Sequence, residues 1–240
     1  MLTDADNGEH AALMTASYLT RLRTGALSAI ATDRLARTDS RTLTVIGTGA
    51  MAFEQVLGVL EVRSIDRIIL VNRTRGKAEA FGGKLAAFSV EVPWEVETDV
   101  SKAVAAADII CCATRSNEPV FAGADLQPGT HINGVGSYLP SMREVDEATL
   151  AKADKIIVDD LEGVKNEAGE LIHGAQSGVW SFDDVHAELA EVAEGQKPGR
   201  ERDDEITFFK SVGAAFFDLA VAQGVYAKVR ADGTGIEVEM

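Results

Sequence analysis

Short apolar runs alternate with helical patterns along the middle of the chain. Runs rich in β-branched residues predict strands, and apolar positions three or four residues apart predict the helices between them. The predicted strands are 42–46, 67–71, 90–94, 108–112, 130–135 and 155–158. The predicted helices are 50–62, 75–87, 99–106 and 147–153. Strands and helices that alternate in this way form right-handed βαβ units, so the sequence predicts an α/β fold with a parallel sheet.

The two ends of the chain show other patterns. A long amphipathic helix is predicted over 15–36, and helical periodicity returns over 184–194 and 211–223, with a polar loop over 194–204. The last ten residues predict a strand or a frayed tail. Near the start, a turn signal at Asp4–Gly8 separates a short strand at 11–14 from only three preceding residues. A hairpin arm of that length is marginal, so we expect the chain to begin inside a structural unit.

A glycine-rich loop follows the first central strand. The order is strand, G-x-G-x-x-A and helix, and its loop residues are Gly47, Gly49, Ala50, Met51 and Ala52. Gly47 permits a tight turn, Gly49 lets the backbone approach a pyrophosphate, and the helix start offers the N–H groups of Ala50 and Met51. An ordinary glycine turn is the alternative, but the strand–loop–helix context favours a Rossmann-type, doubly wound parallel sheet that binds a dinucleotide.

The end of the next strand carries the signal for the type of dinucleotide. An NAD-binding domain usually has Asp or Glu there to bind the ribose 2′-hydroxyl. Here the residues are Asn72, Arg73 and Thr74, which can surround a 2′-phosphate with charge and hydrogen bonds. The sequence therefore predicts NADPH (NADP+) as cofactor, with NAD still possible. Arg63 and Arg67, close by, are interpreted as solvated surface residues.

Composition and charge exclude several classes of protein. A formal net charge of −15 would repel phosphates, so we expect no binding to nucleic acid. The chain has neither an apolar run long enough to cross a membrane nor a secretory leader, so we expect a cytoplasmic protein without a membrane partner. Cys111 and Cys112 are adjacent and are interpreted as buried core thiols. The four histidines show no ligand spacing, so no metal is predicted, and His131, inside a strand, is interpreted as structural.

Taken together, the motifs are similar to those of a known family. The matching segments are Arg23–Ala29, Gly47–Ala52, Cys112–Val120, Pro128–Ser137, Arg143–Asp146, Val158–Asp160, Glu167–Leu171 and Glu205–Gly213. In this order they resemble the ornithine cyclodeaminase/μ-crystallin family, whose members act on small amino acids and their imines. These members include ornithine cyclodeaminases, alanine dehydrogenases and NAD(P)H-dependent ketimine reductases.

The resemblance also implies a second domain. Family chains are longer at the front, where they supply part of the substrate pocket and most of a homodimer contact. We therefore expect 37–211 to form the dinucleotide-binding Rossmann domain, and 1–36 with 212–240 to form a remnant of the substrate and dimerisation domain. A homodimer is doubtful for this shortened chain, which should expose an apolar patch.

The same resemblance assigns candidate site residues. Arg23 would bind the substrate carboxylate, and Tyr138 stands where cyclodeaminases and alanine dehydrogenases have an aspartate. A phenol is a poor general base but can donate a hydrogen bond, so this exchange favours imine reduction over ornithine deamination. Further residues implied to line the cofactor are Thr24, Thr114, Ser116, Val135, Gly136, Ser137 and Ser211.

Three functions remain open at this point. The leading hypothesis is an NADPH-dependent reductase of a small imino acid, such as pyrroline-2-carboxylate or piperideine-2-carboxylate. The first alternative is an NAD-dependent ornithine cyclodeaminase or alanine dehydrogenase, in which another carboxylate, Glu144 or Asp146, would act as the base. The second alternative is a non-catalytic dinucleotide-binding protein.

Overall fold

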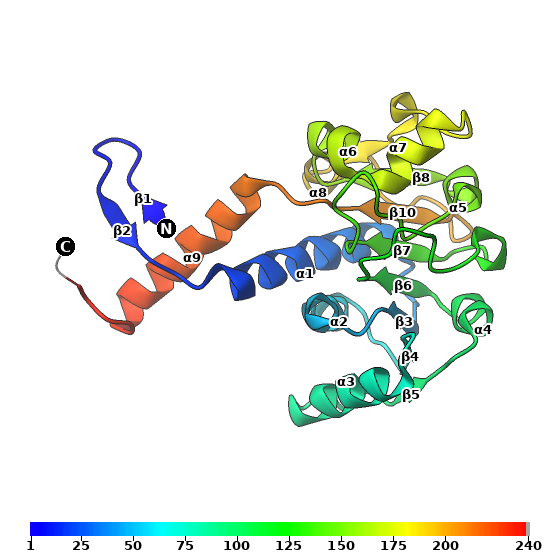
Figure 1. Ribbon diagram of the computed structural model, residues 1–240, viewed down its shortest axis with the longest axis horizontal. Coiled ribbons are helices and arrows are strands. Elements are labelled where there is room, and N and C mark those ends of the chain that lie inside the picture. Colours follow the sequence, from blue (N-terminus) through cyan, green and yellow to red (C-terminus); the bar gives the residue numbers. More distant parts are fainter. Residues whose placement is uncertain (239–240) are drawn as a thin grey trace. The chain divides into compact units, whose positions relative to one another are not determined.

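A parallel sheet dominates the computed structural model, which describes residues 1–238. Its strands are β3 (Thr42–Ile46), β4 (Arg67–Val71), β5 (Trp94–Val96), β6 (Ile109–Cys112), β7 (His131–Gly134), β8 (Lys155–Val158), β9 (Ala187–Glu188) and β10 (Thr207–Lys210). They form one 8-stranded sheet in the order β5-β4-β3-β6-β7-β10-β8-β9 (Figure 1). The predicted α/β, doubly wound parallel architecture is therefore confirmed.

The order of the strands reverses beside β3. The chain runs outward from β3 through β4 to β5, then returns to the other side of β3 as β6. The carboxyl ends of β3 and β6 therefore lie side by side at this reversal, the place where doubly wound sheets form their ligand-binding crevice. In open α/β sheets, ligands bind at such a reversal.

Helices cover both faces of the sheet. They are α2 (Ala50–Val62), α3 (Arg75–Ala87), α4 (Val100–Ala105), α5 (Glu147–Lys152), α6 (Leu161–Glu167), α7 (Gly169–Gln176) and α8 (Leu189–Ala193). One apolar cluster joins α2 and α3 to one face of the sheet. A second cluster joins α4, α5, α6 and α7 to the other face. Because successive strand residues point to opposite faces, Cys111 belongs to the first cluster and Cys112 to the second. Both thiols are free and buried, as predicted.

The contacts divide the chain into two units. The terminal unit is Met1–Arg23 with Ala214–Met240, and the sheet unit is Thr24–Gly213. Helix α1 (Ala16–Leu35) belongs to both, so the division falls inside a helix rather than at the predicted boundary after residue 36. The role of the chain ends as a substrate domain stays a prediction.

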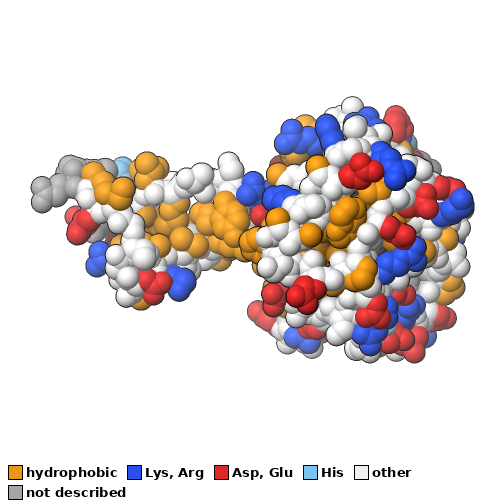
Figure 2. Space-filling view, turned by 90° about the horizontal axis from the view of Figure 1, so that it is seen from below, with side chains coloured by type: hydrophobic (Ala, Val, Ile, Leu, Met, Phe, Trp, Pro, Cys, Tyr) orange, Lys and Arg blue, Asp and Glu red, His pale blue; other side chains and the backbone are white. Residues whose placement is uncertain are grey.

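Within the terminal unit, a two-stranded antiparallel hairpin precedes α1. It pairs β1 (Leu2–Thr3) with β2 (His10–Ala12), and the unit ends with α9 (Ala215–Asp232). None of the residues of α9 is buried, and Phe216 and Leu219 are about half exposed, at 54% and 48%. Hydrophobic side chains cover much of the visible surface of this unit in Figure 2. An apolar helix without a buried face is typical of a surface that packs against a further element.

Several elements differ from the predictions for local reasons. Val90 and Val92 alternate as in a strand, but Pro93 has no N–H to donate, so pairing begins only at Trp94. The predicted helix over 211–223 starts later, at Ala215, because the preceding Gly213 has a φ of 90°. It also runs on to Asp232, and 233–238 lie in neither helix nor strand; 239–240 lie outside the described residues.

Arg63 corrects the surface interpretation made from the sequence. Its residue exposure is only 8%, and its guanidinium donates hydrogen bonds to the carbonyls of Thr32, Asp33 and Ala36 at 2.9, 2.8 and 3.0 Å. These carbonyls lie at or just beyond the C-terminal end of α1, where most carbonyls lack a partner inside the helix; that of Thr32 also accepts the Ala36 N–H at 3.0 Å. Arg63 therefore caps α1. Arg67, half exposed and paired with Glu95, agrees with the surface interpretation.

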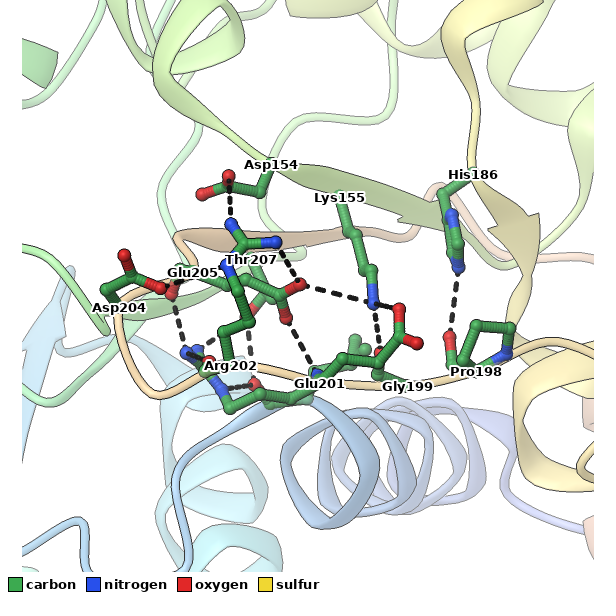
Figure 3. Close-up of polar contacts among 12 residues, drawn as sticks. Asp154, Lys155, His186, Pro198, Gly199, Glu201, Arg202, Asp204, Glu205 and Thr207 are labelled. Carbon is green, nitrogen blue, oxygen red and sulfur yellow. Dashed lines mark hydrogen bonds and ion pairs between the residues drawn. The ribbon is translucent and has the colours of Figure 1, made fainter.

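A second polar cluster lies at the amino ends of β8 and β10, away from the crevice. Lys155 donates to the Gly199 carbonyl at 2.5 Å and pairs with Glu201 at 2.6 Å and Glu205 at 3.4 Å (Figure 3). Arg200 donates to the Leu35 carbonyl at 2.6 Å. These contacts fasten the polar loop after α8 to the sheet and to α1, so this charge cluster is structural.

Replacing Arg63 with methionine should destabilise the protein. Three carbonyls at the end of α1 would lose the Arg63 guanidinium as a donor in a buried place, which should lower the free energy of unfolding by about 3 kcal/mol. Arg67→Met is the matched control, because an exposed ion pair contributes only about 0–1 kcal/mol. Urea unfolding followed by circular dichroism measures both. Equal effects of the two substitutions would contradict the capping role.

Candidate functional site

The phosphate loop turns tightly at the carboxyl end of β3. Gly47 has a φ of 89°, and a Cβ at this position would lie 2.6 Å from Thr114 Cγ2 and 2.8 Å from the Ala113 carbonyl. Its N–H donates to the Val71 carbonyl at 2.9 Å, which ties the loop to β4. Gly47 is therefore required both for its backbone conformation and for the close approach of the next loop.

The start of α2 is open to a ligand. Gly49 is the N-cap residue, no side chain caps the helix, and a Cβ on Gly49 would meet no atom within 4 Å. The first-turn N–H groups, including those of Ala50 and Met51, have no acceptor inside the helix. A helix start with free N–H groups and open space in front fits a pyrophosphate. The residues present thus fit the dinucleotide that the sequence predicts.

The residues after β4 organise a second part of the same edge. Asn72 donates from Nδ2 to Thr48 Oγ1 at 2.7 Å and accepts from the Thr74 N–H at 2.9 Å. Asn72 therefore joins the phosphate loop to Thr74. Arg73 between them is exposed, and within residues 1–238 its guanidinium has no hydrogen-bond or ion-pair partner. A free cation beside a phosphate loop is suited to bind a further anionic group.

The loops that follow β6 and β7 are in close contact at the same edge. A Cβ on Gly136, after β7, would lie 2.2 Å from both the N and the O of Thr114, after β6. Glu144 joins these loops with both carboxylate oxygens. Oε1 accepts from the Thr114 N–H at 2.6 Å and hydroxyl at 2.7 Å, and Oε2 accepts from the N–H groups of Gly136 at 2.7 Å and Ser137 at 3.3 Å.

A buried ion pair lies behind the loop after β7. Lys210 and Glu170 are both 0% exposed and lie 2.8 Å apart. Lys210 donates to the Ser137 carbonyl at 2.6 Å and hydroxyl at 2.5 Å, while this hydroxyl donates to Glu170 at 2.8 Å. A buried pair is stable only when its remaining donors and acceptors are satisfied, and Ser137 supplies these partners. The side chain of Ser137 therefore points into the protein.

The segment after β10 is held in a similar way. Asp159 accepts from the Ser211 hydroxyl at 2.7 Å and from the N–H groups of Val212 and Gly213 at 3.0 and 2.7 Å. The Ser116 hydroxyl is also engaged, donating to the Glu118 carbonyl at 2.6 Å. The hydroxyls of Ser116, Ser137 and Ser211 thus bind protein groups, and their roles in cofactor binding stay predictions.

The structure brings most of the predicted cofactor residues to the carboxyl edge of the sheet unit. These are Gly47, Gly49, Ala50, Met51, Asn72, Arg73, Thr74, Thr114, Ser116, Val135, Gly136, Ser137 and Ser211. Thr24 is buried at 3% exposure in α1. The two predicted catalytic residues belong to different units, Arg23 to the terminal unit and Tyr138 to the sheet unit.

Both predicted catalytic residues have defined surroundings. Arg23 forms an ion pair with Asp218 of α9, with 3.4 Å between Nε and Oδ2 and a side chain only 11% exposed. Tyr138 is 40% exposed and directly follows the loop held by Glu144. The arginine is thus partly desolvated, and the phenol hydroxyl lies on a residue open to solvent.

Both alternative carboxylates accept hydrogen bonds from protein donors. Both oxygens of Glu144 are occupied by the four donors described above. Asp146 caps α5, with Oδ1 accepting from the Thr149 N–H at 2.8 Å and Oδ2 accepting from the Gly123 N–H at 3.0 Å. Burial raises the pKa of Glu144 above its ordinary value, with Lys210 and the Thr114 hydrogen bonds acting in the opposite direction.

His131 shows the chemistry of a structural histidine. It is completely buried, and its ring nitrogens lie 2.9 Å from Thr207 Oγ1 and 3.2 Å from Asn133 Oδ1. Burial lowers its pKa to about 3, so the imidazole is neutral at physiological pH. In the described part of the chain, no three potential metal-ligating side chains come together. No helix within 1–238 has both the length and the apolar composition needed to cross a bilayer.

A family model confirms the resemblance found in the sequence. The model of the ornithine cyclodeaminase/mu-crystallin family matches residues 1–233. The chain belongs to this family. Its Rossmann-type fold is shared with solved structures of similar enzymes.

Individual relatives are similar over nearly the whole chain. A Delta(1)-pyrroline-2-carboxylate reductase of Bacillus cereus is 43% identical over 239 residues, which are 100% of this chain and 73% of the relative. The ketimine reductase mu-crystallin of Rattus norvegicus is 37% identical over 94% of this chain and 67% of its own length. The solved structure of Thermococcus litoralis Delta(1)-pyrroline-2-carboxylate reductase, in complex with NADH and L-proline, has a TM-score of 0.95. It is 38% identical, covering 98% of this chain and 72% of its own.

Several important residues of the edge were not predicted from the sequence. Asp159, Glu170 and Lys210 carry no hint of a site on their own, although each lies in a segment that resembles the family. One signal in the sequence was available. Each of these charged residues lies next to an apolar run and should therefore be buried, and a buried charge is rarely without a partner.

The space in front of Gly49 can be tested directly. Gly49→Ala should leave the free energy of unfolding within about 0.5 kcal/mol, because the added methyl meets no protein atom. It should nevertheless weaken dinucleotide binding roughly tenfold or more, because the methyl occupies the approach of the pyrophosphate. Titration of protein fluorescence measures the affinity.

Gly83→Ala is the matched control for this substitution. Gly83 lies in α3, also with no atom near its ideal Cβ, so the added methyl should leave the affinity unchanged. Unchanged affinity in Gly49→Ala would exclude this loop as the phosphate site.

Proposed function

We propose that the protein is an NADPH-dependent oxidoreductase that reduces a small imino acid to the corresponding amino acid. The substrate class is a cyclic ketimine such as pyrroline-2-carboxylate or piperideine-2-carboxylate. The observation that carries the cofactor assignment is the free Arg73 guanidinium beside an uncapped phosphate loop with no carboxylate after β4. The reductase and ketimine reductase names of the relatives support the reaction class.

The cofactor would be held by groups already in position. N–H groups at the start of α2 would bind the pyrophosphate, and Arg73 with Thr74 would bind the 2′-phosphate. The loops at Thr114 and Gly136 would border the nicotinamide. When bound, NADPH supplies the hydride that reduces the C=N bond.

Residues of the chain would bind the substrate at its carboxylate and at its imine nitrogen. Arg23 supplies a guanidinium suited to a carboxylate, already partly shielded from water and opposed by one acidic partner, Asp218. Tyr138 supplies a hydroxyl that can hydrogen-bond to the nitrogen being reduced. The oxygens of Glu144 and Asp146 already accept hydrogen bonds from protein donors. This favours reduction of a preformed, protonated imine over oxidation of an alkylammonium.

Cofactor preference is the first expected outcome. NADPH should bind tighter than NADH by roughly tenfold or more, and Arg73→Ala should remove most of this difference. Arg75→Ala is the control, because Arg75 is paired with Glu79 at 2.8 Å and should contribute little. Fluorescence titration of the unmodified protein and the two variants with both cofactors gives one NADPH-to-NADH affinity ratio for each protein. Equal affinities in the unmodified protein would refute the NADPH assignment.

The second expected outcome concerns the reaction. The protein should oxidise NADPH in the presence of either cyclic imine, and faster in mildly acidic buffer, because the protonated imine is the better hydride acceptor. Arg23→Ala should raise KM strongly, since truncating a charge-paired anchor costs about 2–5 kcal/mol. Tyr138→Phe should have a smaller effect. Arg34→Ala, an exposed arginine of the same helix, is the control.

The same assay separates the alternatives. Ammonia release from ornithine with NAD would indicate a cyclodeaminase instead. Binding of NADPH without turnover of either imine would indicate a non-catalytic dinucleotide-binding protein.

A further inference from the structure

Glu144 is buried at the place where the two loops of the nicotinamide side meet. Its exposure is 0%, although it lies only eight positions after Gly136 along a surface loop. All four groups directed at its oxygens can act as donors, which suits an ionised, acceptor-only carboxylate. A buried charge with four donors is costly to create and is maintained only if its partners are fixed in place.

The loops on either side of Glu144 are held further along, at Ser137 by Lys210 and Glu170 and at Ser116 by the Arg143 N–H, but Glu144 is the acceptor for the N–H groups of Thr114 and Gly136. Ala113 and Val135 still pair with the sheet, donating to the Ile46 and Cys112 carbonyls at 2.9 and 3.0 Å. One residue further on, the N–H groups of Thr114 and Gly136 donate to Glu144. The phosphate loop differs, because the Gly47 N–H is bound to β4 independently of Glu144.

We propose that Glu144 is a positioning residue, which fixes the spacing of the Thr114 and Gly136 loops and thereby forms the nicotinamide half of the cofactor site. This proposal rests on the dinucleotide binding proposed above. The carboxylate acts through the two loops and does not touch the cofactor. Its loss should therefore affect binding of the nicotinamide while leaving the pyrophosphate and 2′-phosphate contacts unchanged.

Glu144→Gln is the sharpest substitution for a test. The amide has the shape of the carboxylate, but its NH2 group must face either the Thr114 side or the Gly136 side, where N–H donors already point. Asp146→Asn is the matched control. It lies two residues away and weakens the cap of α5, but it holds Gly123 and Thr149 rather than a loop of the crevice.

Two probes separate the halves of the cofactor: NADPH, and 2′-phospho-ADP-ribose, which lacks the nicotinamide. Calorimetric titration gives both dissociation constants for each protein, and the fluorescence of bound NADPH reports how firmly the nicotinamide is held. Near-ultraviolet circular dichroism checks that each variant is folded.

In Glu144→Gln, the dissociation constant of NADPH should rise roughly tenfold, because charged hydrogen bonds are lost, while that of 2′-phospho-ADP-ribose stays within about twofold. The enhancement of NADPH fluorescence on binding should also fall. Asp146→Asn should change neither constant nor the fluorescence.

Two results would overturn the proposal. One is that Glu144→Gln weakens both probes equally, as general destabilisation would; the other is that it weakens neither. Failure of the unmodified protein to bind either probe would instead refute the dinucleotide site itself, and the positioning role with it.

Discussion

The closeness of three loops at the carboxyl edge of the sheet is the constraint on which the site depends. Thr114 lies between Gly47 of the phosphate loop and Gly136 of the loop after β7, and neither glycine has room for a Cβ. Reversal of the strand order beside β3 brings these loops into register, because β3, β6 and β7 are neighbours. Doubly wound sheets generally bind ligands where the strand order reverses, and here two glycines and one threonine bring three loops together at that place.

Charge is used in different ways at the two ends of the strands. At the carboxyl edge, Asp159, Glu144 and Glu170 are buried, and each binds backbone N–H groups, a hydroxyl or Lys210. At the amino edge, Lys155 and its partners fasten a long polar loop. Arg73 stands apart from both groups, since it is a cation without a protein partner in the described chain. In a protein of net charge −15, an unpaired cation at the end of β4 favours an anionic ligand at that place.

The sequence predicted the architecture well and the internal support of the site poorly. The phosphate loop could be found because Gly47 and Gly49 follow a strand and precede a helix, a local pattern with a local cause. The strand β10 was not predicted, because Thr207–Lys210 directly follows a polar loop and lacks the run of β-branched residues that marks the equally short β8. The interpretation of Arg63 was wrong, since its partners are carbonyls about thirty residues away, at the end of α1, which only the fold brings close to it. Glu144 was noticed as a carboxylate, but only the fold shows that its oxygens are already used. Pairings over long distances in the chain depend on tertiary packing, which periodicity does not encode.

The two adjacent cysteines have a consequence for how this protein opens. They lie on opposite faces of β6, in the middle of the sheet between β3 and β7, and both are 0% exposed. Burial raises the pKa of the Cys111 thiol to about 12 and that of Cys112 well above its ordinary value, so neither thiolate forms readily in the native state. A thiol reagent could reach Cys111 only after α2 and α3 leave the sheet, and Cys112 only after the helices of the other face leave it. The rate at which both cysteines are alkylated should therefore report cooperative opening of the sheet unit. Fluctuations of the loops at its edge should not change this rate.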